Sequence, residues 1–152
     1  MNALTLIGGA ALLCGLTCPS FAAPQGGDAA TQRRAAHALD ASGVYDCQGQ
    51  DGKEGPYTAV VTLTKVPAHS EGAHVAYRFS MEVPGFGTYL GQAVGRGRHL
   101  AIHFALTDTQ TRDFGTGLAV LEPGPGPLRF RKFYYQPEYQ GGNQGHEQCT
   151  RR

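Results

Sequence analysis

Between residues 44 and 150 the chain repeats short stretches in which apolar and polar side chains alternate. In residues 57–64, 74–83 and 99–106 every second side chain is apolar. Successive side chains of a strand point to opposite faces of a sheet, so each stretch predicts a strand with one apolar face. Further segments of strand composition are residues 44–49, 86–94, 115–121 and 128–135, with a short eighth at 146–150.

Turn-forming residues separate these stretches. Segments rich in Gly, Pro or Asp lie at residues 50–52, 67–72, 84–85, 95–97, 107–113 and 123–127. No helical pattern of about 10–15 residues lies between the strands, which argues against a parallel sheet built from strand–helix–strand units. We therefore predict an all-β fold, a seven- or eight-stranded antiparallel meander closed into a small barrel, because closure removes exposed sheet edges. A β-sandwich is the alternative.

Two of the four cysteines, Cys47 and Cys149, bracket the strand-rich region. The first and last strands of a closed meander are neighbours, so these two residues are predicted to form one disulfide. A link that closes a loop of about 100 residues contributes about 4–5 kcal/mol in the chain-entropy model. Disulfides persist in oxidising compartments, which favours a periplasmic or extracellular protein.

The first 23 residues carry no charged side chain and combine a short apolar stretch with small residues before Pro24. This pattern is typical of a secretory signal peptide, predicted as residues 1–23. The stretch is too short and too rich in glycine to predict a membrane span. Lipidation at Cys18 is the alternative that this segment leaves open. Residues 24–42 are predicted to form a flexible tether or a short helix, and residues 43–152 a single β-barrel domain.

Composition and motifs exclude several functional classes. The net charge of +1 gives no general attraction to nucleic acid or to anionic membranes. The sequence has no P-loop, no Gly-x-Ser-x-Gly and no His-Glu-x-x-His motif. Glu138, His146 and Glu147 are metal-ligand types, but His146 and Glu147 would point to opposite faces of an extended chain. We therefore predict no catalytic residue, no metal site and no cofactor.

The segment from Phe133 to Cys149 has the most unusual composition, with several tyrosines, two carboxylates and many glycines. Tyrosine on a constrained loop suits recognition of a partner protein. The competing interpretation is that these tyrosines cover one end of the barrel. The predicted binding residues are Tyr134, Tyr135, Glu138, Tyr139, Asn143, His146 and Glu147.

Two short motifs carry a resemblance to a known fold family. Gly43-Val44-Tyr45 opens the first predicted strand, and Gly87-Thr88-Tyr89-Leu90-Gly91 lies in a later one. In these features the chain loosely resembles secreted calycin-type barrels such as avidins and lipocalins, which open with Gly-x-Trp and continue as an eight-stranded meander. The resemblance covers residues 43–135 as a pattern and implies a small β-barrel, and we transfer no ligand-binding residue from it.

Three functions remain open from the sequence. The leading hypothesis is a secreted or periplasmic, non-enzymatic binding protein that recognises a partner protein through a Tyr/Gly-rich loop at residues 134–149, in the manner of an inhibitor or immunity protein. The alternative is a carrier that binds a small apolar ligand in the lumen of the barrel. The third is a small hydrolase that uses Glu138 or His146.

Overall fold

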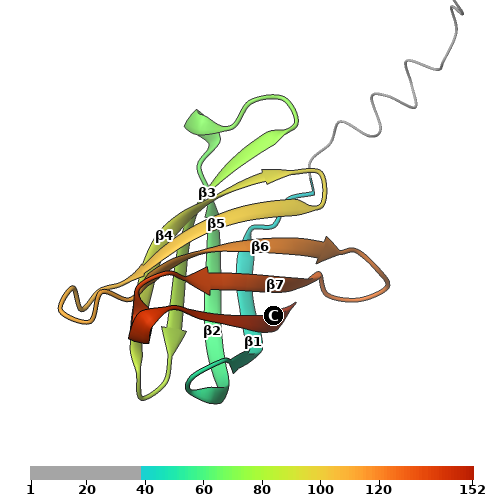
Figure 1. Cartoon of the computed structure of the whole chain (residues 1–152). Coiled ribbons are helices and arrows are strands. Elements are labelled where there is room, and N and C mark those ends of the chain that lie inside the picture. The colour runs from blue at the N-terminus through green and yellow to red at the C-terminus, as the bar shows by residue number, and fades with distance from the viewer. Residues whose placement is uncertain (1–38) are drawn as a thin grey trace, which may run out of the picture.

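The computed structural model describes residues 39–152, which form a closed barrel of eight antiparallel strands (Figure 1). Each strand pairs with its neighbour in sequence, and the last pairs with the first. The strands are β1 (Gly43–Asp51), β2 (Gly55–Lys65), β3 (His74–Val83), β4 (Gly87–Arg96), β5 (His99–Leu106), β6 (Phe114–Glu122), β7 (Arg129–Gln136) and β8 (Asn143–Arg151). The predicted meander barrel is confirmed, and the sandwich alternative is excluded.

The predictions for the N-terminus fall mainly on residues that the structure does not describe. The signal peptide at residues 1–23, Cys18 and most of the tether at 24–42 lie outside the described residues. Within residues 39–152, no helix has the length and apolar character that a membrane-spanning helix requires.

The disulfide joins the two strands that close the barrel. Cys47 of β1 and Cys149 of β8 are register partners, and their sulfur atoms are bonded. The bond spans a sequence separation of 102 residues, so it links the start of the barrel directly to its end. The predicted pairing is confirmed, together with its position at the closure of the meander.

One end of the barrel is filled by a packed core. Side chains that point inward from six strands are almost completely buried there, among them Tyr45, Leu63, Tyr77, Leu100, Leu121 and Phe130. The segment that precedes β1 completes this end, because the Tyr45 hydroxyl donates to the Ala41 carbonyl at 2.7 Å and the Ala41 N–H donates to the Tyr77 hydroxyl at 3.1 Å. We call this the packed end.

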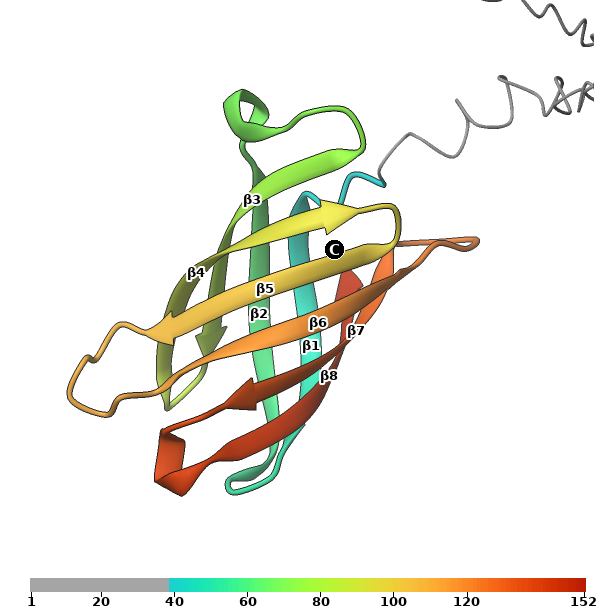
Figure 2. The same cartoon turned by 45° about the horizontal axis from the view of Figure 1, so that its top comes forward.

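Four connections meet at the other end, which we call the mouth. They are residues 52–54, 84–86, 107–113 and 137–142, and the last contains a short 3₁₀ turn at Tyr139–Gly141. Figure 2 shows all four on the side of the barrel away from the β4–β5 and β6–β7 turns. The loop predicted at residues 134–149 is therefore too long, because its first three residues belong to β7 and residues 143–149 belong to β8.

Candidate functional site

A cavity of about 250 Å³ lies inside the mouth of the barrel. Its inner wall is formed by inward-pointing side chains of the strands, and its rim by the connections at residues 52–54, 84–86 and 137–142. The polar side chains of its lining include Glu54, Tyr57, Asp113, Lys132, Tyr139 and Glu147. The packed end closes the barrel beneath it, so the cavity opens in one direction.

Glycines make room for the large polar side chains of this wall. At Gly49 an added Cβ would overlap the ring of Tyr57, and at Gly145 it would overlap the ring of Tyr134. Both tyrosines therefore lie across the strand beside them and not upright from their own strand. Glycine within a strand allows this close approach, which any larger residue would prevent.

A buried ion pair lies at the inner end of the cavity. Lys132 Nζ is 2.8 Å from Glu147 Oε2, with side-chain exposures of 1% and 0%. The Tyr57 hydroxyl donates to the other oxygen of Glu147 at 2.5 Å. Lys132 Nζ also lies 5.3–5.4 Å from the ring centroids of Phe79, Phe104 and Tyr134. The ammonium group is thus held by one carboxylate and three aromatic rings.

The contact between Lys132 and Glu147 is close but poorly aligned. Although the two charged atoms are within ion-pair distance, Lys132 Nζ has no hydrogen-bond partner of acceptable geometry in the described residues. We regard the pair as an electrostatic contact because its separation is short and both groups are buried. The ammonium carries three donors, so it retains donor capacity inside the cavity.

Asp51 accepts four hydrogen bonds at the mouth end of β1. The Tyr134 hydroxyl and the Asn143 amide donate to Oδ2 at 2.6 and 2.8 Å. The backbone N–H groups of Lys53 and Glu54 donate to Oδ1 at 2.8 and 2.9 Å. Burial raises the pKa of Asp51, but these hydrogen bonds outweigh it and the pKa is lowered overall.

Asp113 stands across the mouth in a different environment. It accepts from the Tyr89 hydroxyl at 2.6 Å and from the Gln136 amide at 2.5 Å. Burial raises the pKa of Asp113, and these two hydrogen bonds only partly offset that effect. The Asn143 amide donates to Gln136 at 2.8 Å, so the two carboxylates belong to one network that runs around the wall.

The loop at residues 137–142 is fixed over the rim of the cavity. The Tyr139 hydroxyl and the Gln140 amide both donate to Glu54 Oε1 at 2.8 Å. Glu138 forms an ion pair with Arg112 of the neighbouring connection at 2.5 Å. Burial, together with the hydrogen bond to Glu54, raises the pKa of Tyr139 to about 12. The loop is therefore tied to two other connections and does not project freely.

The predicted binding residues separate into two groups. Tyr134, Tyr139 and Glu147 line the cavity, and Asn143 is buried in the network behind it. Tyr135 and His146 lie on the outer surface of β7 and β8, and Glu138 is at the rim. The division follows from the strands themselves, because neighbouring side chains point to opposite faces. The three candidate metal ligands Glu138, His146 and Glu147 are consequently not brought together.

Several residues of the cavity were not expected from the sequence. They are Asp51, Tyr57, Tyr89, Asp113, Lys132 and Gln136. A signal exists for two of them, because Lys132 has the same parity as Phe130 and Tyr134, and Asp51 has the same parity as Tyr45 and Cys47. A charged residue at an inward-facing position of a strand indicates a buried polar site.

Two other features are weaker candidates. In the described part of the chain, Cys47, Glu147 and Cys149 come within 4.8 Å of one another, but the disulfide occupies both sulfur atoms and removes them as metal ligands. A depression of about 510 Å³ lies outside, over residues of β8, β1 and β2. Asp46 is the charged residue of that depression, and it already forms an ion pair with Arg152.

Comparison of the chain with protein-family models, with characterised proteins and with solved structures gives no match.

Proposed function

We propose that the protein is a binding protein that holds a small organic ligand in the mouth of its barrel. The observation that carries this proposal is the cavity of about 250 Å³ with the buried ammonium of Lys132 at its inner end. A buried charged donor without its full set of hydrogen bonds costs free energy. A ligand that accepts a hydrogen bond from Lys132 would remove part of that cost.

The size and lining of the cavity define the kind of ligand. Pockets for drug-sized ligands measure roughly 300–1,000 Å³, so this cavity fits a metabolite of smaller size. The wall combines aromatic rings with carboxylates and one ammonium group, and the ligand is therefore expected to have polar ends. This differs from the apolar ligand that the sequence led us to consider.

The chemistry of the wall supports binding over catalysis. No Ser, Thr, Cys or His lines the cavity among residues 39–152. The Tyr57, Tyr89 and Tyr134 hydroxyls donate to carboxylates. Burial is the first cause that raises the pKa of each of these tyrosines, so they remain protonated and are poor nucleophiles.

We place this binding function outside the cytoplasm, in the periplasm or the extracellular space. The disulfide between β1 and β8 supports an oxidising compartment. The composition of residues 1–23 supports export by a signal peptide. Sequencing the N-terminus of the mature protein tests this directly, because processing should leave a chain that begins near Pro24 and an intact Met1 would contradict export by cleavage.

Filling the cavity should abolish binding of small ligands. Val83 lines the mouth, so Val83→Trp places a large ring in the cavity. Val94→Trp is the matched control, because Val94 is exposed on the outside of the same hairpin. We expect ligand-observed NMR with a mixed set of cationic, neutral and anionic phenols to show binding to the wild type and to Val94→Trp, and none to Val83→Trp. Equal binding to all three proteins, or to none, would contradict the proposal.

A second candidate function is the docking of a partner protein on the outer surface. Val94, Ala101, Leu118, Phe133 and His146 are successive register partners from β4 to β8. Val94, Leu118 and Phe133 are exposed, as is the neighbouring Tyr135. Contiguous exposed apolar surface is typical of protein–protein contacts.

Mutations distinguish docking on the outer surface from recognition through the loop at residues 137–142. Phe133→Ser with Tyr135→Ser changes the outer surface, whereas Glu138→Ala with Tyr139→Ala changes the rim. A partner that is recovered by the wild type and the rim variant but not by the outer-surface variant would support the outer surface. Loss with the rim variant alone would instead support recognition through the loop at residues 137–142.

A further inference from the structure

The mouth cavity carries more negative than positive charge. Four carboxylates, those of Asp51, Glu54, Asp113 and Glu147, line it, whereas Lys132 is the basic residue of the lining. Lys132 is paired with Glu147, and the other three carboxylates have no basic partner within residues 39–152. A concave site with one sign of charge concentrates the field and attracts the opposite charge.

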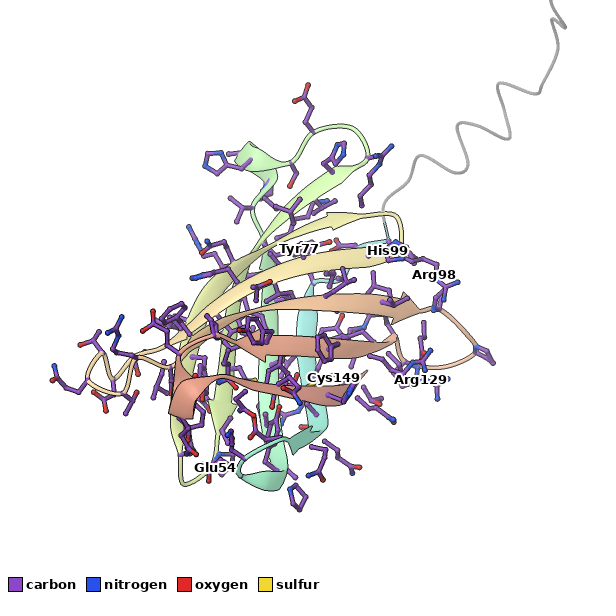
Figure 3. The ribbon with its side chains drawn as sticks, in the orientation of Figure 1. Glu54, Tyr77, Arg98, His99, Arg129 and Cys149 are labelled. Carbon is purple, nitrogen blue, oxygen red and sulfur yellow. A yellow bond between two sulfur atoms is a disulfide. The ribbon has the colours of Figure 1, made fainter. Side chains whose placement is uncertain are left out.

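The basic side chains of the mouth connections do not offset this charge, because Lys53 and Arg112 are balanced there by Asp108 and Glu138. Arg112 is already paired with Glu138. Figure 3 shows Glu54 at the mouth, with Arg98 and Arg129 toward the opposite end of the barrel. Charges separated by more than about 8–10 Å of solvent are largely screened at physiological ionic strength. The excess negative charge therefore remains local to the mouth.

The hydrogen bonds of the wall also favour a cationic ligand. The donors of Tyr57, Tyr89 and Gln136 are directed at carboxylates of the protein. What remains available to a ligand is carboxylate lone pairs and the faces of aromatic rings, and both attract a cation. Asp113 in particular accepts one side-chain hydrogen bond on each oxygen, which leaves a second lone pair on each.

The inner end of the cavity instead favours a ligand group that accepts a hydrogen bond. Lys132 Nζ is a buried donor without a hydrogen-bond partner in the described residues, so it calls for an acceptor. Lys132 precedes the mouth end of β7 at Gln136 by four residues, which is roughly 13 Å along a strand. A ligand that places its positive charge near the mouth and an oxygen near Lys132 satisfies both ends.

We infer that the ligand is a small aromatic amine that carries a hydroxyl or carbonyl oxygen at the end opposite its ammonium group. The oxygen accepts a hydrogen bond from Lys132, the ring packs against Phe104 and Tyr89, and the ammonium group pairs with Asp113. This inference rests on the proposed function, because it names the ligand class of the same cavity.

A series of phenols that differ chiefly in charge tests the inference. Tyramine is cationic, 4-ethylphenol is neutral and 4-hydroxyphenylacetate is anionic, and isothermal titration calorimetry gives the affinity of each for the full barrel. We expect tyramine to bind at least about ten-fold more tightly than 4-ethylphenol, since a hydrogen bond to a charged group changes affinity by about that factor or more. The anion should bind most weakly.

Substitution of one carboxylate tests whether the cavity causes the tighter binding of tyramine. Asp113→Asn should weaken tyramine about ten-fold and leave 4-ethylphenol nearly unchanged. Asp46→Asn is the matched control, because Asp46 is exposed on the outside, and it should change neither affinity. If Asp113→Asn does not fold, Glu54→Gln at the exposed rim serves in its place, with a smaller expected loss.

The outcomes distinguish failure of the amine as the ligand class from failure of the cavity as a binding site. Equal affinity of tyramine and 4-ethylphenol, or tighter binding of the anion, would overturn the amine and leave the cavity as a binding site. A tyramine preference that survives Asp113→Asn and Glu54→Gln would overturn the assignment of the ammonium to the mouth. If none of the three compounds binds, the proposed function itself fails.

Discussion

Lys132 and Glu147 form the most consequential pair of residues in the barrel. Both are almost fully buried, and each supplies the charge that stabilises the other. Removal of one member of a buried ion pair leaves an uncompensated charge and costs about 3–5 kcal/mol, whereas replacement of both members is far less costly. We therefore expect Lys132→Met to destabilise the protein by about that amount and Lys132→Met/Glu147→Gln to recover much of it.

Urea unfolding followed by tyrosine fluorescence measures both variants, because the chain contains no tryptophan. Arg152→Met is the control, since it breaks an exposed ion pair with Asp46 and should leave stability almost unchanged. A double variant that is less stable than Lys132→Met alone would show that the two side chains do not act as a pair.

Asp51 and Asp113 should respond to pH in opposite ways. The folded-state pKa of Asp51 is lowered, so its stabilising contribution is present above the unfolded pKa of about 3.9 and is lost as pH falls through the folded value. The pKa of Asp113, which faces Tyr89, Gln136 and the charge of Asp51, is raised. Ionisation of Asp113 therefore lowers the stability of the protein as pH rises from about 3.9 to the folded-state pKa of this residue.

The measurement compares the free energy of unfolding of the wild type with Asp51→Asn and Asp113→Asn between about pH 3 and pH 7. The advantage of the wild type over Asp51→Asn should shrink as pH falls, because protonation removes the favoured carboxylate. The stability of the wild type relative to Asp113→Asn should instead increase as pH falls through the folded-state pKa of Asp113. Parallel pH profiles for the two variants would contradict the environments that the structure gives these carboxylates.

At the scale of elements, the order and pairing of the strands were predictable, but the character of β8 was not. Strands such as β3 and β5 bury large apolar side chains at alternate positions, and this pattern is readable in the sequence. In β8 the inward positions hold Asn143, Gly145 and Glu147 before the disulfide-bonded Cys149. The Asn143 amide nitrogen donates to Asp51 and Glu147 accepts from Tyr57, and such hydrogen bonds between distant segments leave no local pattern.

The same reasoning explains which part of the candidate site was predicted. The tyrosine and carboxylate content of the C-terminal segment indicated a polar site, and four of its residues belong to the cavity or its network. The strand pattern places Asp51 on the inward face, but its grouping with Tyr89 and Asp113 could not be predicted, because only closure of the barrel brings the three to the same mouth.

The disulfide stabilises the closure between β1 and β8, and its loss should act there first. Cys149 lies seven residues beyond the loop at 137–142, toward the packed end, so the loop keeps its own hydrogen bonds to Glu54 after reduction. In the chain-entropy model a closed loop of about 100 residues contributes about 4–5 kcal/mol. We expect Cys47→Ser/Cys149→Ser to lose stability of that order.

Amide hydrogen exchange locates this effect along the chain. Protection should fall most at the β1–β8 ladder and should fall little where β3 pairs with β4. A uniform loss along all eight ladders would contradict a local role for the disulfide and would indicate that the barrel opens only as one cooperative unit.

At the scale of the whole molecule, the barrel divides into a packed end that provides stability and a mouth that holds a cavity. Apolar side chains and the segment before β1 fill the packed end, whereas charged groups lie around the space at the mouth. Sites for small molecules commonly lie in the mouths of β-barrels, where a rigid scaffold positions a few polar groups. The buried charges and the loop fixed over the rim are consistent with that use.

A crystal structure with tyramine or 4-ethylphenol, whichever binds more tightly, tests the central claim most directly. We predict ligand density inside the mouth, with the phenol oxygen within hydrogen-bond distance of Lys132 Nζ and the ring beside Phe104. Density for the compound on the outer surface, with only water in the cavity, would contradict the account.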